Sequence, residues 1–167
     1  RNDGTRFWIA ITSAPVIRGG RVCGLRGLAT DITGRKKQEQ ALRQSEEKYR
    51  SLVEHAVYGI YRTTTDGHFS SVNPALARML GYEHGADLLG RDILDFYQDP
   101  SERARLIERY AKEERVEGVE VQWKRRDGSP ITVRLTGRVV QAAEGVVEGF
   151  EMIVEDVSET KALEQQF

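Results

Sequence analysis

The sequence predicts an α+β fold with an antiparallel sheet for most of the chain. Residues 58–64 and 68–72 read as strands, short helical segments follow, and three further strands are predicted at 119–125, 131–140 and 146–157. Two strands, a helical block and then three strands are typical of an α+β domain. A second observation is an internal repeat, because the first 33 residues have the same pattern as the last strands.

The closing strands are recognised by their alternation. Apolar residues occupy every second position from Val119 to Trp123 and again from Ile131 to Leu135. This period of two predicts strands with one apolar face that is buried. Asp127-Gly128 lies between them and predicts a hairpin turn.

The helical block is recognised by its start and stop signals. Asn73-Pro74 predicts an N-cap followed by proline in the first turn, and Gly81 ends the helix. Short helical pieces are predicted at 86–89 and 92–97. A capping arrangement then starts a helix that we expect to run from about Asp99 to Arg115.

The internal repeat predicts a domain duplication. Asp3-Gly4 matches Asp127-Gly128, and Asp31-Ile32-Thr33 matches Asp156-Val157-Ser158. Both copies of this ending are followed by a charged helical run. The predicted organisation has four parts, namely 1–33 as the C-terminal strands of a preceding domain, 34–56 as an amphipathic connector helix, 57–157 as a complete domain, and 158–167 as the start of an output connector helix.

The connector carries apolar residues at a spacing of seven. Leu42, Tyr49 and Ala56 recur in this way, and Leu52 widens the stripe. A parallel coiled coil uses such a stripe as its seam, so these four residues are candidates for a homodimer contact. A helix that packs only on its own domain explains the pattern equally well, and both interpretations stay open.

Charge and composition exclude several classes of function. The chain has 25 Lys and Arg against 26 Asp and Glu, a net charge of −1, which argues against electrostatic nucleic-acid binding. No stretch is apolar enough for direct membrane insertion, and no signal peptide opens the chain. The single cysteine, Cys23, excludes an internal disulfide and a multi-cysteine metal site. We expect a cytoplasmic protein, or the cytoplasmic part of a larger receptor.

Catalytic chemistry is poorly supported. His55, His68 and His84 lie 13 and 16 residues apart, without the spacing of a helical metal pair. There is no glycine-rich phosphate loop and no nucleophile elbow. The adjacent carboxylates Glu46-Glu47 and Glu113-Glu114 point to different faces of their helices and read as solvated charges. We therefore expect no enzyme activity and no metal site in this chain.

Several segments together resemble a PAS domain. The run from Asn73 to Tyr82, followed by Leu88-Leu89-Gly90-Arg91, resembles its first half. The run from Trp123 to Gly128 and the ending Asp156-Val157-Ser158 resemble its C-terminal, PAC-type strands. The resemblance implies a five-stranded antiparallel sheet with helices on one face that enclose a small cavity. Residues 1–33 look like the closing three strands of a preceding PAS domain.

The resemblance also implies a function. Similar domains sense a ligand, cofactor or redox state, or act as dimerising signal relays. Residues 158–167 are similar to the connector that leads into the dimerisation helix of a sensor histidine kinase, a two-component protein. Connectors to diguanylate cyclase domains look much alike. We expect a regulatory module that relays a signal to such a kinase, and the alternatives are the module of a cyclase or a ligand-free dimerisation adaptor.

The family's cofactors can be compared with the residues present. Similar haem-binding domains carry an axial histidine on the long helix, which has none here. Light-sensing flavin relatives need a cysteine in the helical half, and residues 45–158 contain none. Haem and covalent flavin are therefore disfavoured, and no cofactor is expected, although a non-covalent flavin or an unidentified small molecule stays open.

A ligand, if present, is expected between the sheet and the helices. The candidates for lining this space are apolar residues of both layers: Ile60, Leu76, Met79, Leu80, Ile93, Phe96, Ile107, Val121, Trp123, Val133, Leu135, Phe150 and Met152. A cavity would offer a pocket, whereas close packing would leave a relay without a ligand. We favour a filled core because no buried charge is evident, and we expect Arg138 to be exposed.

Two polar residues are candidates for signal relay. In similar domains the aspartate at the position of Asp156 ties the outgoing helix to the sheet, and Lys124, Arg125 and Arg126 are its candidate partners. A helix-start carboxylate stabilised by the helix dipole is the alternative. Asn73 is interpreted as a cap first and a ligand contact second.

The N-terminal strands need cover for their apolar residues. A few strands removed from a domain cannot bury one face alone. We therefore expect Ile9, Ile11 and Leu28 to lie in an interface, against a second subunit or against the sheet of the complete domain.

Overall fold

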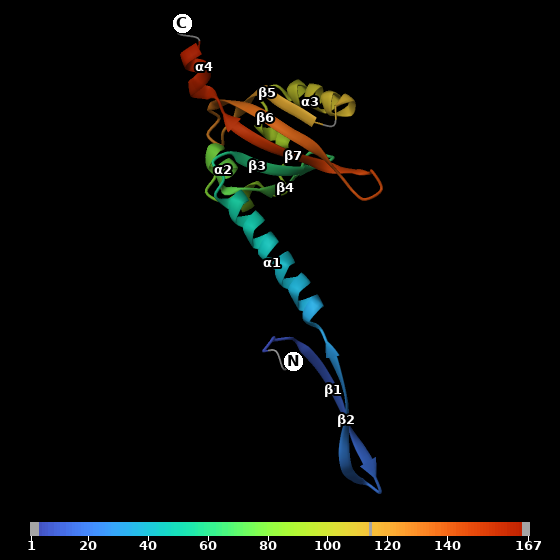
Figure 1. The fold of residues 1–167 in the computed structure, drawn as a ribbon. Helices are drawn as coiled ribbons and strands as arrows, with labels where there is room; N and C mark the ends of the chain where they lie inside the picture. The colour runs from blue at the N-terminus through green and yellow to red at the C-terminus, as the bar shows by residue number, and fades with distance from the viewer. Residues whose placement is uncertain (1–3, 114, 165–167) are drawn as a thin grey trace. The chain divides into compact units, whose positions relative to one another are not determined.

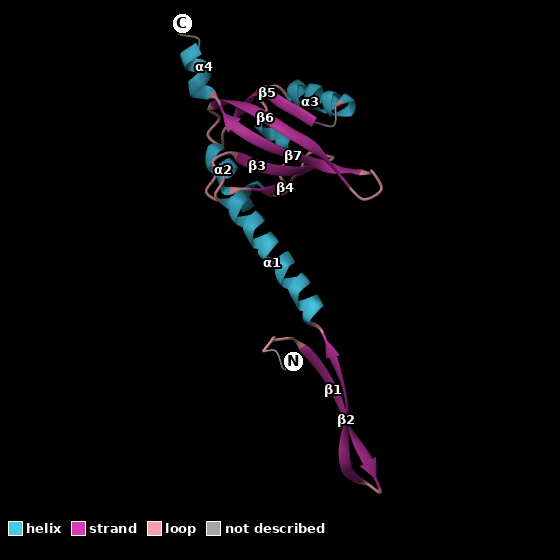
Figure 2. Cartoon of the chain, viewed as in Figure 1, coloured by secondary structure: helices cyan, strands magenta, loops and turns pink. Residues whose placement is uncertain are grey.

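The computed structural model describes residues 4–113 and 115–164. The chain divides into two compact units, Arg1–Arg50 and Ser51–Phe167, which are described separately. Figure 1 traces the chain by residue number, and Figure 2 separates its helices from its strands. Asp3, Glu114 and the last three residues of the output connector lie outside the described residues.

The first unit begins with a two-stranded antiparallel hairpin. Strand β1 (Ile9–Arg18) pairs with β2 (Arg21–Asp31), and Gly19-Gly20 turns between them with positive φ at both glycines. Within the described residues this unit has two strands where three were expected, because residues 4–8 do not form a strand.

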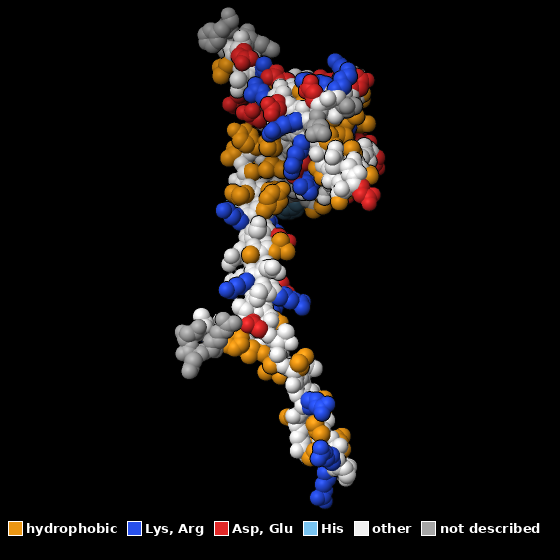
Figure 3. All heavy atoms as spheres, turned by 45° about the vertical axis from the view of Figure 1, so that its right-hand side comes forward, with side chains coloured by type: hydrophobic (Ala, Val, Ile, Leu, Met, Phe, Trp, Pro, Cys, Tyr) orange, Lys and Arg blue, Asp and Glu red, His pale blue; other side chains and the backbone are white. Residues whose placement is uncertain are grey.

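The apolar side chains of the hairpin are exposed. Ile9, Ile11 and Leu28 are among the exposed large hydrophobic residues, and apolar side chains are visible along the hairpin surface (Figure 3). The hairpin by itself does not cover them. Cover by a second subunit or by the sheet of the complete domain stays a prediction.

The connector helix α1 spans Thr33–Glu54. The Asp31 carboxylate accepts a hydrogen bond from the Thr33 backbone N–H at 2.9 Å, which satisfies one free donor at the helix start. Ala56 lies beyond the end of α1 and is partly buried, so it is not part of a helical seam. The other three seam candidates, Leu42, Tyr49 and Leu52, lie on α1 and are exposed.

The second unit contains the expected antiparallel sheet of five strands, and their order is β4–β3–β7–β6–β5. Its strands are β3 (Gly59–Thr64), β4 (Phe69–Val72), β5 (Arg115–Lys124), β6 (Pro130–Gln141) and β7 (Val147–Asp156). The last strand in sequence therefore lies at the centre of the sheet. Its end continues directly into the output helix, so a change in the sheet has a short path to that helix (Figure 1).

The helices are α2 (Pro74–Met79), η1 (Gly85–Leu88), η2 (Ile93–Phe96), α3 (Pro100–Lys112) and α4 (Ser158–Glu164), of which η1 and η2 are 3₁₀ turns. The long helix α3 ends three residues before the expected Arg115, which instead begins β5. The next residue, Val116, pairs with Gly137 of β6 and is fully buried. Burying this valine in the sheet favours the strand over a further helical turn.

The hydrophobic core lies between one face of the sheet and the helices. Trp123 of β5 and Tyr61 of β3 meet there, with ring centres 6.1 Å apart, and Leu76 of α2 and Leu106 of α3 belong to the same buried cluster. The opposite face of the sheet is more open, since Ile153 of β7 is 45% exposed. The helices therefore cover one face, as the sequence predicted.

Candidate functional site

Most residues proposed to line a pocket share this core. The fully packed ones are Leu76, Leu80, Ile93, Phe96, Val121, Trp123, Val133, Leu135, Phe150 and Met152. Met79 and Ile107 are partly buried and pack against the same cluster. The sequence thus grouped twelve of the thirteen candidates correctly on one side of the sheet, and whether a ligand lies among them stays a prediction.

Ile60 is the exception, because it lies on the opposite face of the sheet. Neighbouring residues of a strand point to opposite faces, and the adjacent Tyr61 is in the core. Ile60 pairs with Ile153, and both line a shallow depression with Arg138 and Glu151. The proposal of Ile60 as a lining residue of the core is therefore wrong.

The outer face also holds the arginine that the sequence left ambiguous. Arg138 is exposed, as expected, and its guanidinium lies 2.8 Å from the Glu151 carboxylate, which Arg62 contacts as well. Burial raises the pKa of Glu151, but the bonds from Arg138 and Arg62 outweigh this effect and hold the pKa below its ordinary value. This cluster is a surface ion-pair network on the face away from the core.

The core contains polar groups that the sequence did not reveal. The hydroxyls of Tyr61, Thr63 and Tyr97 and the indole N–H of Trp123 are buried without a hydrogen-bond partner in the described part of the chain. Arg103 of α3 is 8% exposed, so the expectation that no charge is buried is wrong. Arg103 precedes the buried Leu106 and Tyr110 by three and seven positions, and this helical spacing was the available signal.

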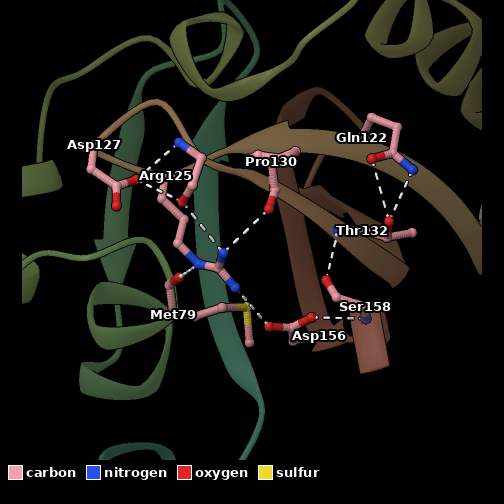
Figure 4. Close-up of polar contacts among 9 residues, drawn as sticks. Met79, Gln122, Arg125, Asp127, Pro130, Thr132, Asp156 and Ser158 are labelled. Atoms are coloured by element: carbon pink, nitrogen blue, oxygen red, sulfur yellow. Dashed lines mark hydrogen bonds and ion pairs between the residues drawn. The ribbon is translucent and has the colours of Figure 1, made fainter. Parts of the chain in front are cut away.

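Arg125 joins three parts of the domain (Figure 4). Its guanidinium donates to the carbonyl oxygens of Met79, at the end of α2, and of Pro130, at the start of β6, both at 3.2 Å. It also lies 3.2 Å from the Asp156 carboxylate. The other oxygen of Asp156 accepts from the Ser158 N–H at 2.9 Å, at the first residue of α4. One side chain thus connects α2, the sheet and the output helix.

The structure distinguishes Arg125 from the other two basic candidates. Lys124 is exposed and forms no ion pair with any described residue. Arg126 places its guanidinium 5.3 Å from the centre of the Tyr82 ring. Lys124, the last residue of β5, lies on the face opposite the buried Trp123, because side chains alternate along a strand.

The output helix has further contacts with the sheet. The Thr132 N–H donates to the Ser158 hydroxyl at 3.0 Å, so this serine bonds the sheet as well as starting the helix (Figure 4). Lys161 pairs with Glu120 of β5 at 3.0 Å, and Glu120 also pairs with Arg134. The hydrogen bond from Lys161 is the largest cause that lowers the pKa of Glu120. These contacts attach the first turn of α4 to β5 and β6.

Asn73 connects the connector helix with the domain. Its side-chain oxygen accepts from the N–H groups of Ile60 and Leu76 at 2.8 and 3.0 Å. Its amide nitrogen donates to the carbonyls of Val53 and Tyr58, both at 3.0 Å. The predicted capping role is confirmed, and two further bonds reach the last turn of α1 and the segment before β3.

Two other classes of site are absent from the described residues. No three His, Cys, Asp or Glu side chains come together in a group that could hold a metal ion there. Within the same residues no helix is both long and apolar enough to cross a membrane.

Comparison with known families decides the identity of the fold. A model of the PAS fold matches residues 47–157, and a second PAS domain model matches residues 1–34. The chain belongs to the PAS family. The resemblance seen in the sequence is thereby confirmed. The match at residues 1–34 is a partial PAS domain, in agreement with the internal repeat. No curated protein sequence matches the chain.

Several solved PAS structures are similar. A domain of the sensory box sensor histidine kinase/response regulator from Geobacter sulfurreducens is 26% identical, with a TM-score of 0.56 over 69% of this chain and 96% of the other. The PAS domain of an HTR-like protein from Haloarcula marismortui is 25% identical, with a TM-score of 0.61 over 72% and 98%. The PAS domain of a protein from Colwellia psychrerythraea, 14% identical with a TM-score of 0.61 over 68% and 97%, shares the fold. The chain is a PAS sensory or signalling module.

Proposed function

We propose that this PAS module relays a change in its core to α4 and onward to a histidine kinase domain in the same parent chain. The observation that carries the proposal is the position of Arg125, which bonds Met79 of α2 and Asp156 before α4. The domain of a sensor histidine kinase/response regulator that is 26% identical supports a kinase as the output.

The relay uses the geometry of the guanidinium. Arginine presents its donors in one rigid plane, so a shift of α2 that moves the Met79 carbonyl tilts the group that also contacts Asp156. Asp156 accepts from the first N–H of α4, which would otherwise be unpaired. A movement of the helical layer thereby changes the stability of the first turn of α4.

Hydrogen exchange of residues 158–164 tests the relay. In Arg125→Ala and Asp156→Asn we expect exchange to be faster by about two- to fivefold, since a partly exposed ion pair contributes about 0.2–1 kcal/mol. Lys124→Ala is the matched control, because Lys124 is adjacent in sequence but has no ion-pair partner among the described residues. Equal exchange in all four proteins would contradict the proposal.

Two alternative functions are kept, a dimerisation adaptor and a module that controls a cyclase. The exposed side chains of Leu42, Tyr49 and Leu52 on α1 favour a dimerisation adaptor that needs no ligand. A diguanylate cyclase output would use a similar connector. Native mass spectrometry of the purified chain separates sensing from the adaptor role, because a co-purifying small molecule supports the former. The product formed by the parent protein, phosphohistidine or a cyclic dinucleotide, separates kinase from cyclase.

A further inference from the structure

Helix α2 is bonded at its start to the last turn of the connector helix. The side-chain amide of Asn73, the N-cap of α2, donates to the carbonyl oxygens of Val53 and Tyr58, both at 3.0 Å. Val53 lies in the last turn of α1, where carbonyl groups lack the usual partner four residues further on. Asn73 is only 2% exposed. A buried side chain therefore fixes the end of α1 to the start of α2.

Helix α2 is bonded at its other end to the start of the output helix. The carbonyl oxygen of Met79, the last residue of α2, accepts from the Arg125 side chain at 3.2 Å. The same guanidinium pairs with Asp156, just before α4 (Figure 4). The next residue is held as well, because the Arg126 N–H donates to the Leu80 carbonyl at 2.9 Å. Both ends of α2 are thus bonded to elements that lead out of the domain.

Helix α2 is short and closely packed. It has six residues, so its ends are about 9 Å apart. Ala75, Leu76 and Ala77 are buried, and a Cβ atom added to Gly59 of β3 would lie only 3.0 Å from the Leu76 side chain. Packed interiors have low compressibility and transmit strain. We therefore expect α2 to move as one body, so that a shift at its start also shifts the carbonyl groups at its end.

We propose that α2 carries a signal from the connector helix α1 to the output helix α4, with Asn73 as the positioning residue at its start. The route runs from the last turn of α1 through Asn73 and α2 to Arg125, and from there to Asp156 before α4. This inference rests on the proposed relay to α4 and adds a second input. The module would respond to whatever moves α1, such as the partial PAS domain at residues 1–34 that precedes it in the chain, without a ligand in the core.

The end of α1 contains amides that report on this route. The N–H groups of His55 and Ala56 donate to the carbonyl oxygens of Ser51 and Val53, at 3.1 and 3.4 Å. Asn73 holds the same Val53 carbonyl from the side of α2. Energetic coupling between two sites is reciprocal, so loosening the contact before α4 should also loosen the last turn of α1.

Hydrogen exchange at His55 and Ala56 is therefore the first test. In Arg125→Ala and in Asp156→Asn we expect both amides to exchange at least twofold faster than in the native chain. Lys124→Ala is the matched control, because Lys124 is adjacent to Arg125 and has no ion-pair partner among the described residues. Faster exchange in α4 but not at His55 and Ala56 would overturn the route through α2 and leave the relay standing. Native exchange in α4 as well would contradict the relay itself.

A proline in α1 tests the opposite direction. Ser51→Pro removes one helical hydrogen bond and bends α1 just before its last turn. Gln44→Pro is the matched control, because it makes the same change two turns earlier, on the same side of the exposed helix and away from Val53. We expect Ser51→Pro to make residues 158–164 exchange about twofold faster, and Gln44→Pro to leave their exchange unchanged.

The double variant Ser51→Pro, Arg125→Ala distinguishes α2 from the sheet as the route. Asn73 also bonds Ile60 of β3, and β3 pairs with β7, which ends before α4. If α2 and Arg125 carry the signal, the proline adds nothing to exchange in α4 once the arginine is removed. An equal further rise in the double variant would assign the signal to the sheet and overturn the proposal. The test at the end of α1 replaces only partly exposed side chains, so it decides the matter even where a proline variant fails to fold.

Discussion

At the scale of single residues, Asn73 shows how much one side chain can organise. An asparagine amide has two acceptor sites and two donors, and all four are used here. The residue is also buried, so each bond replaces one that water would otherwise make. Asn73 is therefore both the cap of α2 and the connection between the end of α1 and the sheet.

Replacing Asn73 should be more damaging than removing an ordinary cap. We expect Asn73→Ala to lower the free energy of unfolding by about 2–4 kcal/mol, because four hydrogen bonds are lost at a buried site. Asn73→Asp should also be destabilising, since it replaces the NH2 group that supplies both donors with one oxygen that faces the carbonyls of Val53 and Tyr58. Urea denaturation measures both.

The control for this prediction is Asp92→Ala. Asp92 caps η2 through one bond to the Leu94 N–H at 2.9 Å, and such a loss costs about 0.5–2 kcal/mol. If Asn73→Ala costs no more than Asp92→Ala, the bonds to Val53 and Tyr58 do not contribute to stability.

At the scale of elements, α1 is a long helix with no buried residue. Its ion pairs, such as Arg35–Glu39 and Arg43–Glu47, are spaced four residues apart and exposed, so each contributes only a few tenths of a kcal/mol. Exposed Leu42, Tyr49 and Leu52 remain on its surface. A helix in proteins derives most of its stability from packing an apolar face, so α1 is expected to pack against a second copy.

The double variant Leu42→Asp, Leu52→Asp tests this pairing. We expect dimers of the native chain and monomers of the variant in sedimentation velocity, because two charges enter the apolar seam. Gln40→Asp, Gln44→Asp is the control of equal charge, since residues two positions apart lie on nearly opposite sides of a helix. An unchanged dimer in the seam variant would mean that another surface holds the subunits.

At the scale of the whole molecule, the hairpin of β1 and β2 differs from the second unit. A two-stranded sheet is marginally stable in water, and this one leaves its large apolar side chains exposed. Its strand edges also have free backbone groups, which favour pairing with another chain. The partial PAS domain at residues 1–34 is thus expected to contribute to association.

Deleting residues 1–33 tests this contribution. We expect association to weaken while the complete domain keeps its fold, because the core consists of residues from Tyr61 onward. Sedimentation equilibrium measures the first effect, and the Tm from circular dichroism measures the second. Association as tight as in the full chain would contradict an interface through Ile9, Ile11 and Leu28.

Local patterns in the sequence determined the fold. Alternation from Val119 to Trp123 and the Asn73-Pro74 start signal depend on neighbouring residues, and these predict strands and helix starts directly. The motifs that resemble PAS domains added the five-stranded sheet. The boundary between α3 and β5 was misplaced because the burial of Val116 depends on its partner strand.

The tertiary structure alone decided which polar residues act together. Lys124, Arg125 and Arg126 are three adjacent basic residues, so the sequence could not tell which one pairs with Asp156. Arg125 does so because its guanidinium also reaches the Met79 carbonyl at the end of α2. The register of β3 with β7 places Ile60 on the outer face. Arg103 of α3 is buried with its guanidinium 5.9 Å from the centre of the Phe150 ring of β7, because burial depends on positions in space that no local sequence pattern specifies.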